Sequence, residues 1–84
     1  MNKAETIETL KRIVKPYVKN NEAFDNLTEE TDFLRDLQIN SANLVDVALD
    51  VEEAFDITID NASMEKMLNV KAALEIIEAK LSEK

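Results

Sequence analysis

The chain has 84 residues, a formal net charge of −8, 45% hydrophobic residues, no Gly, one Pro, and neither Cys nor His. We expect a single domain, residues 1–84, with too small a core to favour a deep catalytic cleft; the missing Cys and His exclude disulfides, thiolate or imidazole nucleophiles and the usual zinc ligands. Without Gly the chain also lacks the turns that β-hairpins need, whereas its Leu, Ala, Glu and Lys residues favour helices, so we predict an all-α fold.

The first predicted helix runs from Ala4 to about Val18. Apolar residues recur in it at three- and four-residue steps: Ile7, Leu10, Val14 and Tyr17. Pro16 removes one backbone donor and crowds the carbonyl four residues earlier, so we expect a kink or a loosened last turn.

Residues 20–38 form a long polar connection that contains five large apolar residues: Phe24, Leu27, Phe33, Leu34 and Leu37. We expect these side chains to hold an ordered loop against the core. Phe33 and Leu37, four residues apart, could form one helical turn before a central bend.

The best-formed amphipathic helix follows this bend, and Ser41 stands at its start. Its predicted buried stripe consists of Leu44, Val47, Ala48, Val51 and Phe55. A serine before a helix is most often an N-cap, but Asn40 or Asn43 could cap this helix instead. A hydroxyl at the positive end of a helix is also well placed to carry a phosphate ester, because nearby amides stabilise the dianion.

Residues 56–60 alternate polar and apolar side chains, but no second strand is predicted, so we expect an extended loop with Ile59 facing inward. A short helix follows over residues 61–68, capped by Asp60 or Asn61, with Met64 and either Met67 or Leu68 facing the core. Asn69 opens the last helix, whose predicted buried stripe consists of Val70, Ala73, Leu74, Ile77 and Leu81. The pattern predicts a small four-helix bundle with a long ordered loop between the first and second helices and a short third helix.

The negative charge is concentrated in residues 36–65, which contain eight acidic residues and no Lys or Arg, whereas the rest of the chain balances ten carboxylates against ten bases. This field would repel phosphate backbones and anionic lipids, so we expect basic protein surfaces as partners, and neither nucleic acid nor membrane. The sequence has no apolar run of signal-peptide length and none near the ~20 residues of a membrane span. We therefore expect a cytoplasmic protein, and we take it to be a monomer.

The carboxylates also raise the possibility of catalysis or metal binding. An acid/base pair would need a cleft and a partner group, and neither is evident. An EF-hand loop counted from Asp56 fails, because Asn61 stands where the loop needs Gly and Met67 where it needs Glu. We therefore predict no catalytic residue and no metal site, apart from weak divalent-ion association with the acidic face, and any reactive group must be brought in.

The segment around Ser41 resembles the signature of the acyl carrier proteins. In most members that signature is Asp-Leu-Gly-x-Asp-Ser-Leu, followed by an acidic helix that ends in a Glu-Glu-Phe-Asp-like sequence. This chain has Asp36-Leu37-Gln38-Ile39-Asn40-Ser41-Ala42, then Val45-Asp46, then Glu52-Glu53-Ala54-Phe55-Asp56. Further similarity at Ile59, at Glu65-Lys66-Met67 and at residues 70–74 extends the resemblance over essentially the whole chain.

The resemblance implies that Ser41 carries 4'-phosphopantetheine, whose terminal thiol holds acyl groups as thioesters. Gln38, Asn40 and Ala42 depart from the usual Gly, Asp and Leu or Met, in the sequence that the modifying transferase reads. These departures favour a specialised type II carrier, of a polyketide-like or secondary fatty-acyl pathway. The alternatives are a peptidyl or aminoacyl carrier, which differs in its cargo, and an unmodified helical adaptor, which has no prosthetic group.

The resemblance also implies a non-catalytic protein that presents acyl groups to successive enzymes through its second helix. Its partners would be a phosphopantetheinyl transferase and acyl-transferring and chain-elongating enzymes with basic docking patches. The residues expected to steer those surfaces are Asp46, Asp50, Glu52 and Glu53. Val45 and Leu49, one turn apart and off the buried stripe, would make the central apolar contacts, with edge-of-core packing as the alternative.

An acyl chain could enter the bundle between helices, at a slot lined by Phe55, Ile59, Met64 and Leu74. A small bundle lined by aliphatic side chains and a flexible Met can open such a slot. Most of the family has a small residue where this chain has Met64. Its thioether would therefore shorten the slot unless it swings aside.

Overall fold

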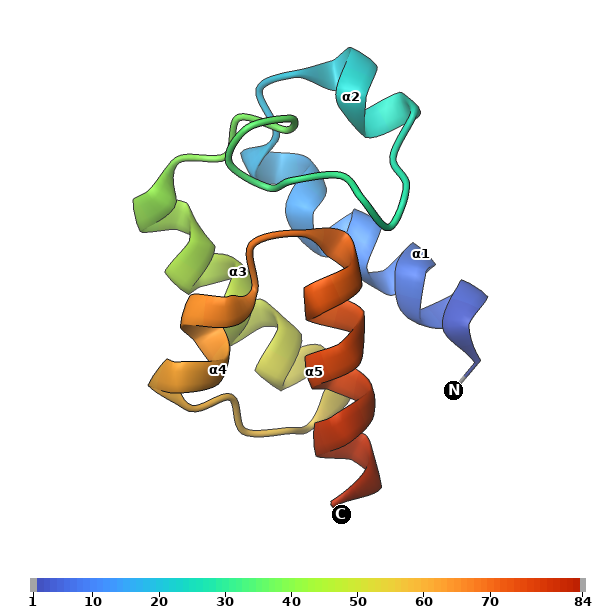
Figure 1. The fold of residues 1–84 in the computed structure, drawn as a ribbon, viewed down its shortest axis with the longest axis vertical. Coiled ribbons are helices and arrows are strands. Elements are labelled where there is room, and N and C mark those ends of the chain that lie inside the picture. The colour runs from blue at the N-terminus through green and yellow to red at the C-terminus, as the bar shows by residue number, and fades with distance from the viewer. Residues whose placement is uncertain (1, 84) are drawn as a thin grey trace.

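Residues 2–83, the part of the chain that this computed structural model describes, contain five α-helices and one 3₁₀ helix. They are α1 (Lys3–Val14), η1 (Lys15–Tyr17), α2 (Asn21–Asp25), α3 (Ser41–Phe55), α4 (Asn61–Lys66) and α5 (Val70–Ser82). Figure 1 shows α1 packed against α3 and α5, with α4 against α5 and α2 set apart in the connection above them. Residues 2–83 form no β-strand, which confirms the predicted all-α bundle.

The first helix begins at a capping residue and has, near Pro16, the loosened last turn that the sequence predicts. Asn2 caps it, since its side-chain oxygen accepts a hydrogen bond from the Glu5 amide at 2.9 Å. The α-helical part ends at Val14, and the chain continues as the tighter turn η1, in which Pro16 lies near the N-terminal end. Pro16 therefore loosens the last turn without kinking the helix, because a Pro in a first turn has no hydrogen bond to lose.

The long connection is ordered, as predicted, but it contains a helix that the prediction missed. Asn20 caps α2 by accepting a hydrogen bond from the Ala23 amide at 3.2 Å. The five residues of α2 are too few to show a helical period, so the sequence pattern could not reveal it. Phe24 of α2 packs against the core and has the Lys11 ammonium 5.7 Å from its ring centroid, which ties α2 to α1.

The apolar residues of the connection do not all face inward. Phe33 and Leu37 are fully buried, and Phe24 and Leu27 are half-buried against the core. The prediction for Leu34 is wrong, because this side chain is 37% exposed. The single turn over residues 32–37 explains the difference: residues four apart share its inner face, and a residue one step along points outward.

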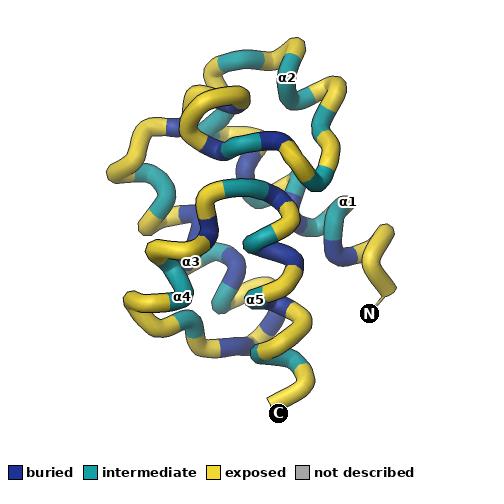
Figure 2. The backbone as a smooth tube through the Cα atoms, viewed as in Figure 1, coloured by how far each residue is buried: buried dark blue, intermediate teal, exposed yellow. Residues whose placement is uncertain are grey.

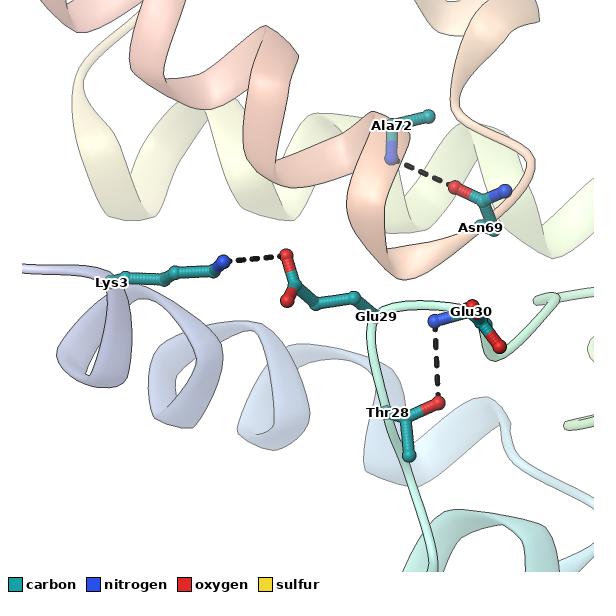
Figure 3. Close-up of polar contacts among 6 residues, drawn as sticks. All are labelled: Lys3, Thr28, Glu29, Glu30, Asn69 and Ala72. Carbon is teal, nitrogen blue, oxygen red and sulfur yellow. Dashed lines mark hydrogen bonds and ion pairs between the residues drawn. The ribbon is translucent and has the colours of Figure 1, made fainter.

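Backbone hydrogen bonds fasten this connection to the link between α4 and α5. The Phe33 amide donates to the Leu68 carbonyl at 3.0 Å, and the Val70 amide donates to the Thr31 carbonyl at 3.0 Å. Glu29 forms an ion pair with Lys3 at 2.7 Å, close to the start of α5, where Asn69 caps the Ala72 amide (Figure 3). The connection, which leads into α3, is thus fastened both to α1 and to the α4–α5 link.

The core lies between α1, α3, α5 and the connection (Figure 2). The α3 stripe is confirmed, with Leu44 half-buried and its other members buried. The α5 stripe is confirmed in the same way, with Leu81 half-buried. Of the two candidates after α4, Met67 is buried, whereas Leu68 is 48% exposed. None of the helices in residues 2–83 combines the length and the apolar character needed to cross a bilayer.

The bend before α3 depends on Gln38, whose backbone is left-handed, with a φ of 57°. The residues on both sides of it are held in place. The Leu37 carbonyl accepts hydrogen bonds from the Lys19 and Asn20 amides at 3.1 and 3.3 Å, and the Ile39 amide donates to the Phe33 carbonyl at 2.9 Å. The chain therefore adopts here the conformation that favours Gly, at the position where the signature it resembles has Gly.

Gln38→Gly should stabilise the protein by up to about 1 kcal/mol. The left-handed conformation costs a residue with a Cβ roughly 1–2 kcal/mol, and the greater freedom of Gly in the unfolded chain cancels part of the gain. Urea unfolding followed by circular dichroism measures the change. Gln38→Ala is the matched control, since it keeps the Cβ and should give no gain; equal shifts in both variants would contradict this account of the bend.

Candidate functional site

Ser41 is the first residue of α3, and its side chain is exposed. The N-cap is Asn40, whose side-chain oxygen accepts a hydrogen bond from the Ala42 amide at 2.9 Å. The backbone carbonyl of Asn40 also accepts one from the Asn43 amide at 2.8 Å. The interpretation of Ser41 as the cap is therefore wrong, and the Ser41 hydroxyl has no hydrogen-bonding partner within residues 2–83.

The surroundings of this hydroxyl suit a phosphate ester. α3 is 15 residues long, so the amides of its first turn and its macrodipole place partial positive charge at Ser41. The first turn of α3 contains no acidic residue that would repel a phosphate. An exposed, unbonded hydroxyl at the positive end of a helix therefore fits the attachment of 4'-phosphopantetheine.

The two apolar residues predicted for docking are open to solvent. Val45 is 45% exposed and Leu49 is 56% exposed, one turn further along α3. Neither belongs to the buried core cluster, which favours docking over the alternative of edge-of-core packing. Together they form an exposed apolar strip that begins one turn after Ser41.

The acidic residues predicted for docking fall into two groups. Asp46 and Glu53 are exposed, and neither takes part in the ion pairs found within residues 2–83. Asp50 and Glu52 are half-buried and bonded: Asp50 accepts a hydrogen bond from the Tyr17 hydroxyl at 3.2 Å, and Glu52 accepts one from the Ile59 amide at 2.8 Å. Of the two groups, only the first presents carboxylates that make no hydrogen bond or ion pair within residues 2–83.

Tyr17 is a residue whose contact with this face the sequence analysis missed, because its place in the apolar stripe of the first helix indicated only packing. Partial burial raises the pKa of the Tyr17 phenol, and the hydrogen bond to Asp50 and the charges of Asp50 and Asp46 raise it further. The phenol therefore stays protonated and donates to Asp50, joining the end of the first helical segment to the middle of α3. No local signal reveals a pair 33 residues apart.

Three of the four predicted slot residues belong to the core or pack against it. Phe55 and Leu74 are buried in the core cluster, and Ile59 is half-buried against it. Met64 is half-buried on α4 and is not among the described side chains that pack against this cluster. Asp60 caps α4 as predicted, and hydrogen bonds from the Ser63 hydroxyl and amide hold the pKa of this carboxyl below its usual value.

Metal binding finds no support in the geometry: nowhere in residues 2–83 do three or more Asp or Glu side chains gather as metal ligands. The larger surface depressions include one along α1, lined by Ala4, Glu5, Glu8, Thr9 and Arg12, away from Ser41. The candidate functional features of the described residues are thus Ser41 and the exposed face of α3.

The fold and this site are those of a class of protein, the small helical carrier domain, with an exposed serine at the start of an acidic helix. No protein-family model matches the chain. The acyl carrier protein of Coprothermobacter proteolyticus is 33% identical over 81 residues, covering 96% of each chain. That of Petrotoga mobilis is 32% identical over 82 residues, 98% of this chain and 94% of the relative.

A third relative, the acyl carrier protein of Desulforapulum autotrophicum, is 39% identical over 56 residues, 67% of this chain and 73% of its own. The first two similarities run nearly end to end in both partners. The chain belongs to the acyl carrier protein family. This confirms the family that the sequence around Ser41 resembles.

Proposed function

We propose that this protein is a non-catalytic acyl carrier, a single domain over residues 1–84 that carries 4'-phosphopantetheine on Ser41. The observation that carries the proposal is the Ser41 hydroxyl, exposed and unbonded at the start of α3 because Asn40 caps the helix. When bound, the group supplies a thiol that holds acyl chains as thioesters, which the chain itself cannot do because it has no Cys.

The cargo is proposed to be the acyl intermediates of type II fatty-acid or polyketide-like biosynthesis. In this role the residues of the chain bind and orient. The first-turn amides of α3 stabilise the phosphate charge at Ser41. Asp46 and Glu53 steer basic surfaces of the transferase and of acyl-transferring enzymes, and Val45 and Leu49 supply the apolar centre of a small, transient interface.

Incubation with coenzyme A and a broad-specificity phosphopantetheinyl transferase tests the proposal. The Ser41 oxygen should bond to the phosphorus next to pantetheine, adenosine bisphosphate should leave, and the hydroxyl proton should pass to the transferase. The intact mass should rise by one phosphopantetheine. The chain has no Cys that could mimic this result by forming a disulfide with the reagent.

A slow reaction is compatible with the proposal, because Asn40 and Ala42 depart from the signature. Asn40→Asp with Ala42→Leu should then accelerate it. Asp also serves as an N-cap, so the double variant keeps the start of α3. If the double variant is folded by circular dichroism and still takes up no phosphopantetheine, the carrier function is refuted.

Charge reversal on α3 tests the docking face. Asp46→Lys or Glu53→Lys should slow the modification of Ser41 roughly tenfold at low salt, because each removes attraction to a basic partner and adds repulsion. Glu8→Lys and Glu75→Lys, at exposed positions on α1 and α5, are the controls. The difference should shrink at about 1 M salt, where screening acts over roughly 3 Å. Equal slowing at all four positions would argue against a defined face.

A further inference from the structure

The connection between α3 and α4 is held at three points by Glu52. The Glu52 carbonyl accepts hydrogen bonds from the Asp56 amide and, at 3.1 Å, from the Ile57 amide. The Glu52 carboxylate accepts a third, from the Ile59 amide at 2.8 Å, seven residues along the chain. The first two bonds end the helix, but the third uses a charged side chain to place the middle of the loop.

The loop has fixed ends on both sides of Ile59. Asp56 ends α3 in a left-handed conformation, with φ and ψ both 53°. Asp60 starts α4 by accepting a hydrogen bond from the Ser63 amide at 2.8 Å. In Figure 1 this is the yellow-to-orange segment that runs along the bottom of the view from α3 to α4. Ile59 stands one residue before the α4 cap, so the Glu52 carboxylate sets the position from which α4 begins.

Apart from its packing against α5, few contacts hold α4 in place. None of its residues is fully buried, and the neighbouring Met67 makes the contact with the core. At its far end, the Leu68 carbonyl accepts the hydrogen bond from the Phe33 amide at 3.0 Å. α4 is thus held at its two ends, and the residues between them make few contacts with the core. Its position therefore depends on the Glu52 bond as well as on packing against α5.

We propose that Glu52 is a positioning residue whose carboxylate holds Ile59 and the start of α4 over the proposed acyl slot, and so limits the length of acyl chain that enters. We call this hydrogen bond between Glu52 and the Ile59 amide the latch. Ile59 packs against the core cluster that contains Phe55 and Leu74, so an acyl chain that enters the core at this point must displace it. The role in cargo selection rests on the proposed acyl-carrier function. The latch itself belongs to the unmodified protein and can be tested without any prosthetic group.

Amide hydrogen exchange of the unmodified protein tests the latch. In Glu52→Ala the Ile59 amide should exchange about ten- to a hundredfold faster, the range for losing a hydrogen bond to a charged acceptor. Rates are expressed relative to the Ile77 amide in the middle of α5, so that any change in global stability cancels. Glu53→Ala is the matched control, because Glu53 is the next residue on the same helix and is exposed.

Glu52→Gln separates the latch from the charge. The Gln side-chain oxygen can accept the same hydrogen bond, so Ile59 should stay within about threefold of the native protection. Exchange as fast in Glu52→Gln as in Glu52→Ala would overturn the proposal, because the hydrogen bond would then not be the cause. Unchanged exchange in Glu52→Ala would overturn it directly.

A second experiment measures the length of acyl chain that each variant accepts. Proteins fully loaded on Ser41 with saturated acyl chains of increasing length are compared through the chemical shifts of Phe55 and Leu74, which change when a chain reaches them. Glu52→Ala should accept longer chains than the native protein, and Glu52→Gln should restore the native limit. An identical limit in all variants would overturn the role in cargo selection. Failure to load Ser41 at all would instead refute the proposed function, and the exchange result on the latch would stand.

Discussion

Ser41→Ala should abolish phosphopantetheine addition and leave the fold intact. The hydroxyl is the nucleophile of the modification, and the variant removes that oxygen alone. The same hydroxyl makes no hydrogen bond within residues 2–83, so its loss should change the free energy of unfolding by less than about 0.5 kcal/mol. Intact mass spectrometry after incubation with coenzyme A and the transferase gives the first result, and urea unfolding gives the second.

Two further variants serve as controls for the assignment of Ser41. Ser63→Ala should still be modified, because Ser63 lies in α4 and its amide and hydroxyl bond to Asp60. Asn40→Ala should lose about 1 kcal/mol of stability, the usual cost of removing an N-cap, although it keeps the Ser41 hydroxyl. Addition of phosphopantetheine to Ser41→Ala would place the attachment elsewhere and contradict the assignment of Ser41.

Phe33→Ala should lower the free energy of unfolding by about 3–5 kcal/mol. Domains of this size have roughly 5–15 kcal/mol in total, so the variant should be partly unfolded even without denaturant at the low end of that range. Phe33 has no exposed surface, although it lies in a connection outside the helices. Truncating it leaves a cavity in the core cluster that the surrounding hydrogen-bonded backbone cannot readily close.

Leu34→Ala is the control for Phe33→Ala, because Leu34 is the next residue and is 37% exposed. It should cost less than about 1 kcal/mol. Because the Phe33 carbonyl accepts the Ile39 amide at 2.9 Å, loosening at Phe33 should also disturb the bend that presents Ser41. Similar losses in the two variants, measured by urea unfolding, would show that this connection is not part of the core.

The long helices, the location of the charge and the candidate attachment serine could all be identified from the amino-acid sequence. The stripes of α3 and α5 repeat over three turns or more, and a period sustained that long depends on local geometry alone. Asn69 was recognisable as a cap because it stands directly before a helical pattern, and the cap of α4 was narrowed to Asp60 or Asn61, of which the structure selects Asp60. Ser41 was recognisable from the signature residues on both sides of it, which are contiguous in the chain.

The tertiary structure decided which of three nearby polar residues caps α3. Asn40, Ser41 and Asn43 all have suitable side chains, and the choice depends on where the left-handed bend at Gln38 lets the helix begin. Hydrogen bonds from Lys19 and Asn20, between η1 and α2, and to the α4–α5 link hold that bend, and the periodicity of the sequence does not reveal them. The tertiary structure also decided the hydrogen-bond partners of Asp50 and Glu52. Sequence shows that these carboxylates lie on α3, but only the approach of Tyr17 and of the Ile59 amide shows that they are bonded, because hydrogen bonds between distant residues depend on the packed fold.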